Sequence, residues 1–362
     1  MALSIEVVRP ADLSDDDIAC WLDIQAMDPS LDSPFLSPYW CQAVERAQQD
    51  SRYAFKVAII REAGKARGFF PVRAGRLTAL PVGAPFSDYQ AVIAEPGLEF
   101  DVRDLLRALQ VQRYDFTLQL QAQAAFAAYA KGSLDVRMTE LPDGYEAYEA
   151  AKRADGEKIF KKMGTSRRNA ERDFGPVRFT PVSDSKEAFD ALLDAKSRQL
   201  RASGHSDIFR PPWSRRLLED LVQRRTPEFG AGLFTLHIGD ELAAIHLHVH
   251  TRRTLNAWLI THNPKFDRIS PGILLFLEIL KWMGEEGLHR MDLGIGDYQF
   301  KRALCNKVET VTYGSVGLPS PVTWMRQAAY SASALAEALP LGKFSHYPAR
   351  ARRRLDVIRS LN

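Results

Sequence analysis

Apolar and polar residues alternate along the first half of the chain in a way that predicts a mixed α/β domain. The opening "LSIEVVR" has the two-residue period of a half-buried strand, and "DLSDDDIACWLDIQAM" has the longer period of a helix capped by Asp or Ser. Pro38 suits the first turn of a second helix, and Gly64 and Gly75 suit turns between antiparallel strands. The predicted elements of this half are a strand at 3–9, helices at 12–27, 38–49 and 101–111, two or three strands within 53–81, and a strand at 114–121.

In the second half, helical periodicity comes first and strand periodicity follows. Residues 141–180 are polar and basic, and we interpret them as a bridge between the halves. After two helices, a turn at Gly239 and Asp240 separates strands that read as antiparallel, and a strand, loop, helix and strand then form one crossover. The predicted elements are helices at 186–202, 212–224, 272–284 and 297–304, and strands at 232–238, 242–250, 254–261, 289–294 and 307–318.

The start of the helix predicted at 272–284 has the features of an anion site. Amide N–H groups at a helix N-terminus lack partners inside the helix, so they can bind an anion. Lys265 and Arg268 in the preceding loop add positive charge, which suits a pyrophosphate such as that of coenzyme A. A helix cap without a ligand is the alternative. The residues predicted to bind the cofactor are Arg268, Ile269, Ser270, Pro271 and Gly272.

Three histidines alternate with aliphatic residues in "AAIHLHVH". Strand periodicity puts His246, His248 and His250 on one face. Side chains at this spacing spread over ~13 Å, so the three cannot ligate one metal ion, and we predict no metal site. One alternative is a strand face that lines a wet cleft, with His248 as a proton acceptor and His246 and His250 as substrate-binding residues. A structural role for all three is the other.

The stretch "RMDLGIGDYQFK" places a carboxylate in an otherwise apolar strand. Asp292 is costly to bury unless it has a partner or works at an opening. It could take the proton of an attacking amine or hydroxyl, while Lys301 could hold an anionic group. Asp297 can cap the short helix that follows. A buried ion pair between Asp292 and an arginine or lysine is the alternative.

The net charge of +3 describes a nearly neutral protein, so we expect no DNA or RNA partner. The positive charge is concentrated: residues 152–172 and 321–362 carry +5 each, and the remainder carries −7. The first segment is either a solvated helix face or a site for a sugar phosphate or lipid diphosphate. Its candidate substrate-binding residues are Arg167, Arg168 and Arg172.

The second basic segment, 321–362, follows the last predicted strand and is rich in arginine. We consider three alternatives: a solubilising tail, attachment to an anionic membrane surface, and binding of a cyclic dinucleotide through stacked and paired guanidinium groups. The candidate regulatory residues are Arg350, Arg352, Arg353 and Arg354.

Cysteine usage and hydropathy indicate the compartment. Cys20, Cys41 and Cys305 are odd in number and unevenly spaced, which favours reduced thiols in the cytosol. The N-terminus lacks the order of a signal peptide, and no apolar run approaches the ~20 residues that span a bilayer. We expect the protein in the cytoplasm, free or attached to the inner face of the plasma membrane.

The order of these elements, and several motifs within them, resemble a known family. The motifs are "TSRRNAERDFG", "ELAAIHLHVH", "NPKFDRISPGILL" and "EEGLHRMDLGIGDYQFKRAL", with "SPFLSPYW" and "FSDYQAVIA" in the first half. They are similar to the bacterial exopolysaccharide-associated acetyltransferases labelled CelD or BcsL, members of the GNAT superfamily related to FemAB-type transferases. The resemblance runs to about Pro319 and implies an α/β fold with mixed sheets. It divides the chain into tandem GNAT-like domains at 1–145 and 146–320, with an arginine-rich helical or flexible tail at 321–362.

The resemblance implies transfer of an acyl group from acetyl-CoA to an amine or hydroxyl of an exopolysaccharide sugar or its lipid-linked precursor. It places Asp292, Asp297 and Lys301 near the reaction cleft. Relatives tend to have Tyr-Lys where this chain has Phe300 and Lys301, so a tyrosine acid is missing at position 300 and Tyr298 is a candidate substitute. Two rivals are a non-catalytic GNAT-fold regulatory module controlled by the arginine-rich tail and a FemAB-like aminoacyltransferase. The chain contains no G-x-S-x-G, phosphate-loop or dinucleotide-binding motif, so those chemistries have no support.

Overall fold

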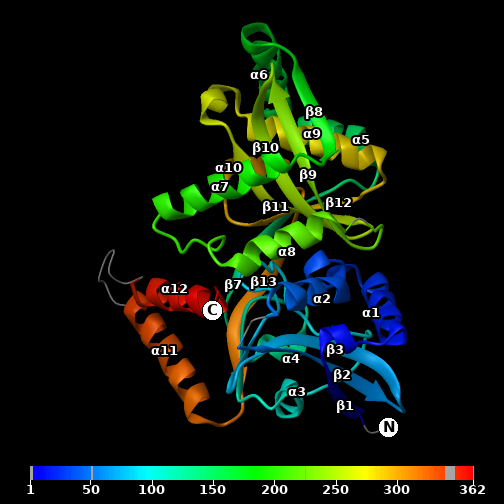
Figure 1. Cartoon of the computed structure of the whole chain (residues 1–362), viewed down its shortest axis with the longest axis vertical. Coiled ribbons are helices and arrows are strands. Elements are labelled where there is room, and N and C mark those ends of the chain that lie inside the picture. The colour runs from blue at the N-terminus through cyan, green and yellow to red at the C-terminus, as the bar shows by residue number, and fades with distance from the viewer. Residues whose placement is uncertain (1–2, 50–51, 225, 339–346, 362) are drawn as a thin grey trace. The chain divides into compact units, whose positions relative to one another are not determined.

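The chain folds into two compact units whose segments interleave along the sequence (Figure 1). The structure, a computed structural model, describes residues 3–49, 52–224, 226–338 and 347–361, with the side chains at 337–338, 347–350 and 352–353 outside the description. Unit 1 consists of Met1–Leu134, Gly204–Leu217 and Thr310–Asn362, and unit 2 consists of Asp135–Ser203 and Leu218–Glu309. These limits differ from the predicted ranges because unit 1 takes segments from three parts of the chain.

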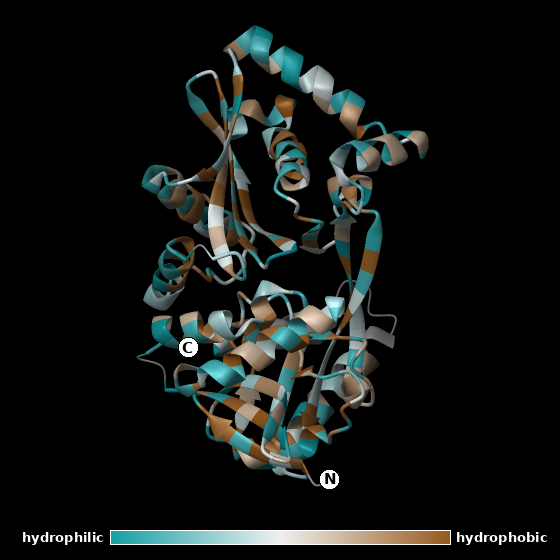
Figure 2. Cartoon of the chain, turned by 90° about the vertical axis from the view of Figure 1, so that its right-hand side faces the viewer, coloured by the Kyte–Doolittle hydropathy of each residue, from teal (hydrophilic) through white to brown (hydrophobic). Residues whose placement is uncertain are grey.

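Unit 1 is built on a mixed sheet with the strand order β1-β2-β3-β4-β6-β13, and β5 pairs with β3. Among the described strands of this unit, only β4 and β6 are parallel neighbours. Figure 2 shows many hydrophobic residues along the strands, and most residues of β2, β3 and β6 are buried, which is the pattern of a sheet covered on both faces. The strands are β1 (Leu3–Val8), β2 (Ala54–Glu62), β3 (Lys65–Ala74), β4 (Thr78–Leu80), β5 (Ile93–Ala94), β6 (Arg113–Leu120) and β13 (Lys307–Gly317).

The helices of unit 1 begin where the sequence predicts caps. Ser14 accepts a hydrogen bond from the Asp17 amide at the start of α1, and Ser37 caps α2 just before Pro38. Between β2 and β3 a tight turn contains Gly64 at φ 82°. The helical elements are η1 (Pro10–Asp12), α1 (Asp15–Met27), η2 (Pro29–Leu31), η3 (Pro34–Leu36), α2 (Pro38–Ala47), α3 (Val102–Leu109), α4 (Ala124–Ala127), α11 (Pro321–Ala338) and α12 (Tyr347–Leu361).

Within unit 2 the strand order is β7-β12-β11-β10-β9-β8. In the part of unit 2 that the structure describes, only β11 and β12 are parallel neighbours, as the predicted crossover requires. The predicted α/β class with mixed sheets is therefore confirmed. The strands are β7 (Ala130–Glu140), β8 (Val177–Ser183), β9 (Gly230–Ile238), β10 (Glu241–His250), β11 (Thr254–His262) and β12 (Arg290–Ile295). The helices are α5 (Gly144–Ala154), α6 (Ile159–Phe174), α7 (Lys186–Ala202), η4 (Pro264–Ile269), α9 (Pro271–Glu285) and α10 (Gln299–Leu304). Helix α8 (Pro212–Val222) belongs to unit 1 up to Leu217 and to unit 2 from Leu218.

The apolar face of α9 forms the centre of the unit 2 core. Phe276, Leu280 and Met283 are buried there, together with Phe234 of β9 and Met291 of β12. Residues of α5 and α6 complete the same cluster. The core thus fixes α9 against the strands that flank its two ends in sequence, β11 and β12.

The polar composition of residues 141–180 predicted a bridge between the halves, and this prediction is wrong. The segment contains α5, α6 and the start of β8. In α6 the buried residues Ile159, Phe160, Met163 and Ala170 form a narrow stripe among many basic side chains. The stripe is too sparse to dominate the sequence pattern, yet it is sufficient to dock the helix. No helix in the described ranges is long and apolar enough to cross a bilayer.

Candidate functional site

The parallel strands β11 and β12 of unit 2 separate soon after they meet. Thr254, Leu255 and Asn256 pair with Arg290, Met291 and Asp292. Beyond that point β11 continues to residue 262 and β12 to residue 295 without pairing to each other. The backbone groups of β11 on this side have no strand partner among the described residues, so a ligand could hydrogen-bond to them.

Two buried polar side chains lie where the strands part. Asn256 is 1% exposed and Asp292 is 2% exposed. The Asn256 side-chain amide donates to Asp292 Oδ2 at 3.0 Å, and the Gly294 backbone N–H donates to Asp292 Oδ1 at 2.7 Å. Asn256 Oδ1 accepts no hydrogen bond from the described residues. A buried acceptor of this kind usually has a partner, so a donor on a ligand would satisfy it.

The start of α9 lies at the far end of β11. Ser270 adopts a left-handed conformation with φ 58°, and the Ile273 and Leu274 amides bond to the Ser270 carbonyl. Pro271 has no N–H, so Gly272 supplies the amide that remains available in this first turn. A Cβ at Gly272 would meet only Ile260 Cδ1 of β11, at 3.7 Å. Packing therefore does not require glycine here, whereas close approach of a ligand would.

The cations before α9 differ in availability. Lys265 is ion-paired with Glu241. Arg268 is exposed and has no ion pair with the described residues. Asp267 accepts a hydrogen bond from His262 Nε2 at 2.9 Å. Arg268 is thus the cation that could meet an anionic group without first losing a protein partner.

The segment after β12 brings Lys301 and Tyr298 beside the strand end. Lys301 Nζ donates to the Ile295 carbonyl at 2.7 Å and lies 5.6 Å from the centre of the Tyr298 ring. Tyr298 is 62% exposed and stacks on Phe300, which in turn contacts Phe276 of α9. An exposed phenol next to an ammonium group is suited to exchange a proton with a bound ligand.

The sequence predicts that Asp297 caps α10, but Asp297 does not cap this helix. The N-cap residue is Tyr298, and it makes no side-chain capping bond. The carboxylate of Asp297 instead pairs with Arg302 at 2.6 Å and with Arg137 at 2.7 Å. Hydrogen bonds from Arg302 and Arg137 hold the pKa of Asp297 below its ordinary value. Two arginines compete successfully with the backbone because their charges attract the carboxylate more strongly.

The histidines of β10 share one face, as strand periodicity predicts. His246 is fully buried and His248 is 3% exposed. Both stack on Phe234, with ring centres 6.0 and 4.3 Å away, and His250 Nδ1 lies 3.0 Å from the Thr251 carbonyl. Burial, with a smaller effect of Lys196, lowers the pKa of His246 to about 3. The predicted substrate and proton roles of the three remain predictions, with two of the rings packed among aromatic side chains.

Glycines on β9 make room for these rings. Gly232 lies opposite His248 and Gly230 lies opposite His250. A Cβ at Gly232 would approach His248 Cε1 to 2.9 Å, and one at Gly230 would approach His250 Nε2 to 2.6 Å. The small residues of "GAGLF" therefore match the large rings of "HLHVH" on the neighbouring strand. The spacing of glycines and histidines in the sequence is a signal that could have predicted this pairing.

The arginines predicted to bind substrate on α6 are mostly engaged with protein groups. Arg167 pairs with Glu278 of α9 at 2.6 Å and with Glu171 at 3.1 Å. Arg172 pairs with the adjacent Asp173 at 2.7 Å. Arg168 is exposed and donates to the Thr165 hydroxyl at 3.0 Å. Of the three, Arg168 has no carboxylate partner among the described residues.

The remaining predictions concern metals and the C-terminal arginines. Within the described ranges, no group of three or more His, Cys, Asp or Glu side chains is arranged to hold a metal ion. Arg354 is exposed on α12. The side chains of Arg350, Arg352 and Arg353 lie outside the described residues.

Comparisons with known proteins concern the family and the fold. Residues 157–302, most of which belong to unit 2, match the model of a family described as an acetyltransferase (GNAT) domain. The solved structure of FemX aligns with a TM-score of 0.55 and 10% identity over 88% of this chain and 99% of that chain, which shows a shared fold. A tandem GNAT protein from the clavulanic acid biosynthesis pathway aligns with a TM-score of 0.47 and 14% identity, over 88% of this chain and 100% of that chain. No curated protein was found to match.

Proposed function

We propose that this protein is an acyltransferase that moves an acyl group from acyl-CoA to an amine or hydroxyl of an exopolysaccharide sugar or its lipid-linked precursor. The observation that carries the proposal is the separation of β11 and β12 beyond Asn256 and Asp292, with the start of α9 beyond it. The match of residues 157–302 to an acetyltransferase (GNAT) domain supports the reaction class. The acceptor class rests on the motif resemblance alone.

The residues at the opening fit a coenzyme A donor. Gly272 offers an amide at the positive end of the α9 dipole, and the uncommitted Arg268 can pair with a phosphate. The free edge of β11 and Asn256 Oδ1 can bond to an amide-rich chain such as pantetheine. When bound, the cofactor supplies an acyl group activated as a thioester.

The chain's own groups would then accept the proton that the acceptor loses and donate a proton to the departing thiolate. As the acceptor's nitrogen or oxygen forms a bond to the acyl carbon, the carbon–sulfur bond breaks and the acceptor loses a proton. Asp292 is the candidate acceptor of that proton, held in place by Asn256 and the Gly294 amide. Tyr298, with Lys301 beside its ring, is the candidate donor of a proton to the departing thiolate.

Calorimetric titration of acetyl-CoA, with a parallel assay for thiol release, tests the proposal. Gly272→Glu should abolish binding, because a carboxylate would occupy the anion position and repel the phosphates. Gly164→Glu on α6 is the matched control, since a Cβ there would likewise meet one atom, Arg168 Nη1, at 3.7 Å. Binding that survives in the control and is lost in Gly272→Glu supports the donor site. A folded parent protein that binds neither acetyl-CoA nor coenzyme A contradicts the proposal.

A further inference from the structure

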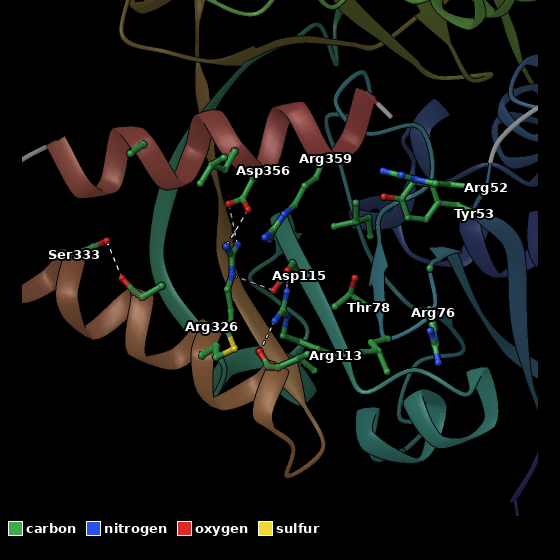
Figure 3. A pocket seen from close by; sticks show the side chains of 18 of the residues that line it. Arg52, Tyr53, Arg76, Thr78, Arg113, Asp115, Arg326, Ser333, Asp356 and Arg359 are labelled. Carbon is green, nitrogen blue, oxygen red and sulfur yellow. Dashed lines mark hydrogen bonds and ion pairs between the residues drawn. The ribbon is translucent and has the colours of Figure 1, made fainter.

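Unit 1 contains a cavity of about 950 Å³ between its sheet and the two C-terminal helices (Figure 3). Its size is at the upper end of the range, ~300–1,000 Å³, of sites for small organic ligands. The walls come from β3, β4 and β6 and their connections on one side, and from α11 and α12 on the other. All the lining residues belong to unit 1, so the cavity is separate from the site on β11, β12 and α9.

A buried ion-pair network holds these walls together. Arg326 of α11 bonds to both oxygens of Asp356 of α12 at 2.9 Å and lies 3.2 Å from Asp115 of β6. Asp115 also pairs with Arg113 at 2.9 Å, and Arg113 donates to the Val322 carbonyl of α11. Arg326, Asp115 and Arg113 are at most 7% exposed. Because these charges are desolvated and paired, the network fixes both helices and leaves an arranged cavity instead of a loose gap.

The cavity has more positive charge than this network needs. Its lining contains five arginines and two aspartates, and both aspartates are used by Arg113 and Arg326. Arg52, Arg76 and Arg359 form no ion pair with the described residues. Figure 3 shows the Arg359 side chain extending from α12 into the space near Asp115, and Arg52 lying beside Tyr53 at one end. An excess of three charges favours an anion with more than one negative charge.

Arg73 adds positive charge behind this wall. It is 1% exposed, donates to Gln48 Oε1 at 3.1 Å and to the Arg359 carbonyl at 3.2 Å, and makes no ion pair with the described residues. Its guanidinium lies 4.5 Å from the centre of the Tyr53 ring, and that of Arg52 lies 5.4 Å from it. The one aromatic ring among the described lining residues is therefore already covered by two cations.

The remaining lining is aliphatic. Apart from Tyr53, Thr78 and Ser333, no neutral hydrogen-bonding side chain of the described residues lines the cavity. The aliphatic residues are Leu77, Leu80, Val322, Met325, Ala329, Ala332, Ala351 and Leu355. A planar base would find no free ring to stack on, whereas a hydrocarbon chain would bury apolar surface.

We infer that this cavity binds an amphiphilic phosphate: an aliphatic chain against α11 and α12, with its phosphate paired to Arg359 and Arg52. Guanidinium groups bind phosphate oxygens through two parallel hydrogen bonds, which suits this head group. The ligand could reach the cavity as a free alkyl phosphate or as a phospholipid from a bilayer. This inference does not depend on the acyltransferase proposal.

The test is calorimetric titration of the full chain with decyl phosphate below its micelle concentration. Inorganic phosphate, which lacks the chain, and decyl glucoside, which lacks the charge, are compared with it. A second arm measures co-sedimentation with phosphatidylcholine vesicles that contain phosphatidic acid. We expect decyl phosphate to bind with one-to-one stoichiometry and at least about tenfold more tightly than either comparison ligand. One-to-one binding identifies a free ligand, and retention by vesicles alone identifies a bilayer lipid.

Two comparisons of variants distinguish binding inside the cavity from nonspecific attraction of the ligand to the protein surface. Arg52→Gln and Arg359→Gln should each weaken binding about tenfold, and Arg107→Gln, an exposed change on α3 outside the cavity, should leave it unchanged. Ala329→Trp should fill the cavity and abolish binding, whereas Ala328→Trp on the same helix lies outside the lining. Absence of binding in both arms, equal binding of decyl glucoside, or binding unaffected by Ala329→Trp would overturn the inference.

Discussion

Buried polar residues in unit 2 divide into those with partners and those without. Asp292 receives two hydrogen bonds, from Asn256 and from the Gly294 amide, so its burial is compensated locally. His246 is fully buried, and neither of its ring nitrogens bonds to a described residue. The first arrangement can support proton transfer at an opening, while the second keeps an imidazole neutral. Each makes a separate prediction.

Asp292→Asn should lower kcat by about 10²- to 10⁴-fold, the usual contribution of a general base. The new amide also turns one acceptor into a donor facing another donor, which should cost about 1–3 kcal/mol of the free energy of unfolding. Asp240→Asn, on a fully exposed aspartate, is the matched control for both effects. Steady-state kinetics and urea unfolding measure them. A kcat within threefold of the parent's would remove Asp292 from the mechanism.

Protonation of His246 should couple stability to pH. The pKa of His246 is about 3 when folded, against an ordinary value of 6.5, so between these values the unfolded chain binds a proton that the folded one does not. Stability therefore falls as pH decreases through about 6.5. From pH 7.5 to 5 the parent should lose about 2 kcal/mol more than His246→Leu. Urea unfolding at several pH values checks this; His205→Leu, on an exposed histidine, should keep the parent's slope.

At the scale of elements, strands β9 and β10 are matched by side-chain size. The glycines of "GAGLF" face the rings of "HLHVH", so neither strand packs without the other. Residue periodicity predicted that the histidines share a face, because alternation along a strand is a local property. It did not predict their burial, which depends on the aromatic rings that α9 and β9 supply. The sequence likewise did not predict Asn256 as a site residue, because its position beside Asp292 depends on the register between β11 and β12. That register cannot be predicted from either strand alone.

Gly232→Ala should destabilise the protein by about 1–3 kcal/mol, because its Cβ would lie 2.9 Å from His248 Cε1. The cost should largely disappear in the background of His248→Ala, where the opposing ring is gone. Gly272→Ala is the control, since its nearest contact would be an ordinary 3.7 Å. Unfolding free energies of the single and double variants complete the cycle. Additive effects of Gly232→Ala and His248→Ala would contradict the proposed steric pairing.

At the scale of the whole molecule, chain order and unit membership diverge. Unit 1 completes its sheet with β13, which lies beside β6 although nearly the whole of unit 2 separates them in sequence. Its C-terminal helices then attach to β6 through Arg326 and Asp115. Composition and periodicity predicted most strands and helices of both halves, because these are local. They could not predict which strands pair over long sequence distances, since that choice depends on the assembled core.

The fragment 1–145, which follows the predicted first domain, should fail to fold cooperatively. It contains β6 but lacks β13, so one edge of β6 and the apolar surface around it would be exposed. Circular dichroism during urea unfolding should show no sharp transition for the fragment and a cooperative one for the full chain. A fragment joining residues 1–134, 204–217 and 310–362 by flexible linkers, which holds all of unit 1, is the matched control. Cooperative unfolding of fragment 1–145 alone would contradict this expectation.

Because β13 is far from β6 in sequence, it is synthesised much later than the rest of the unit 1 sheet. A ribosome adds ~5–20 residues per second, and roughly 200 residues separate the end of β6 from the end of β13, so the first sheet waits ~10–40 s for its last strand. During that interval the N-terminal segment is a partly finished structure with a bare strand edge, while all of unit 2 emerges. The nascent chain is then most exposed to aggregation and most dependent on chaperones, and slower translation of the middle of the message would lengthen the risk.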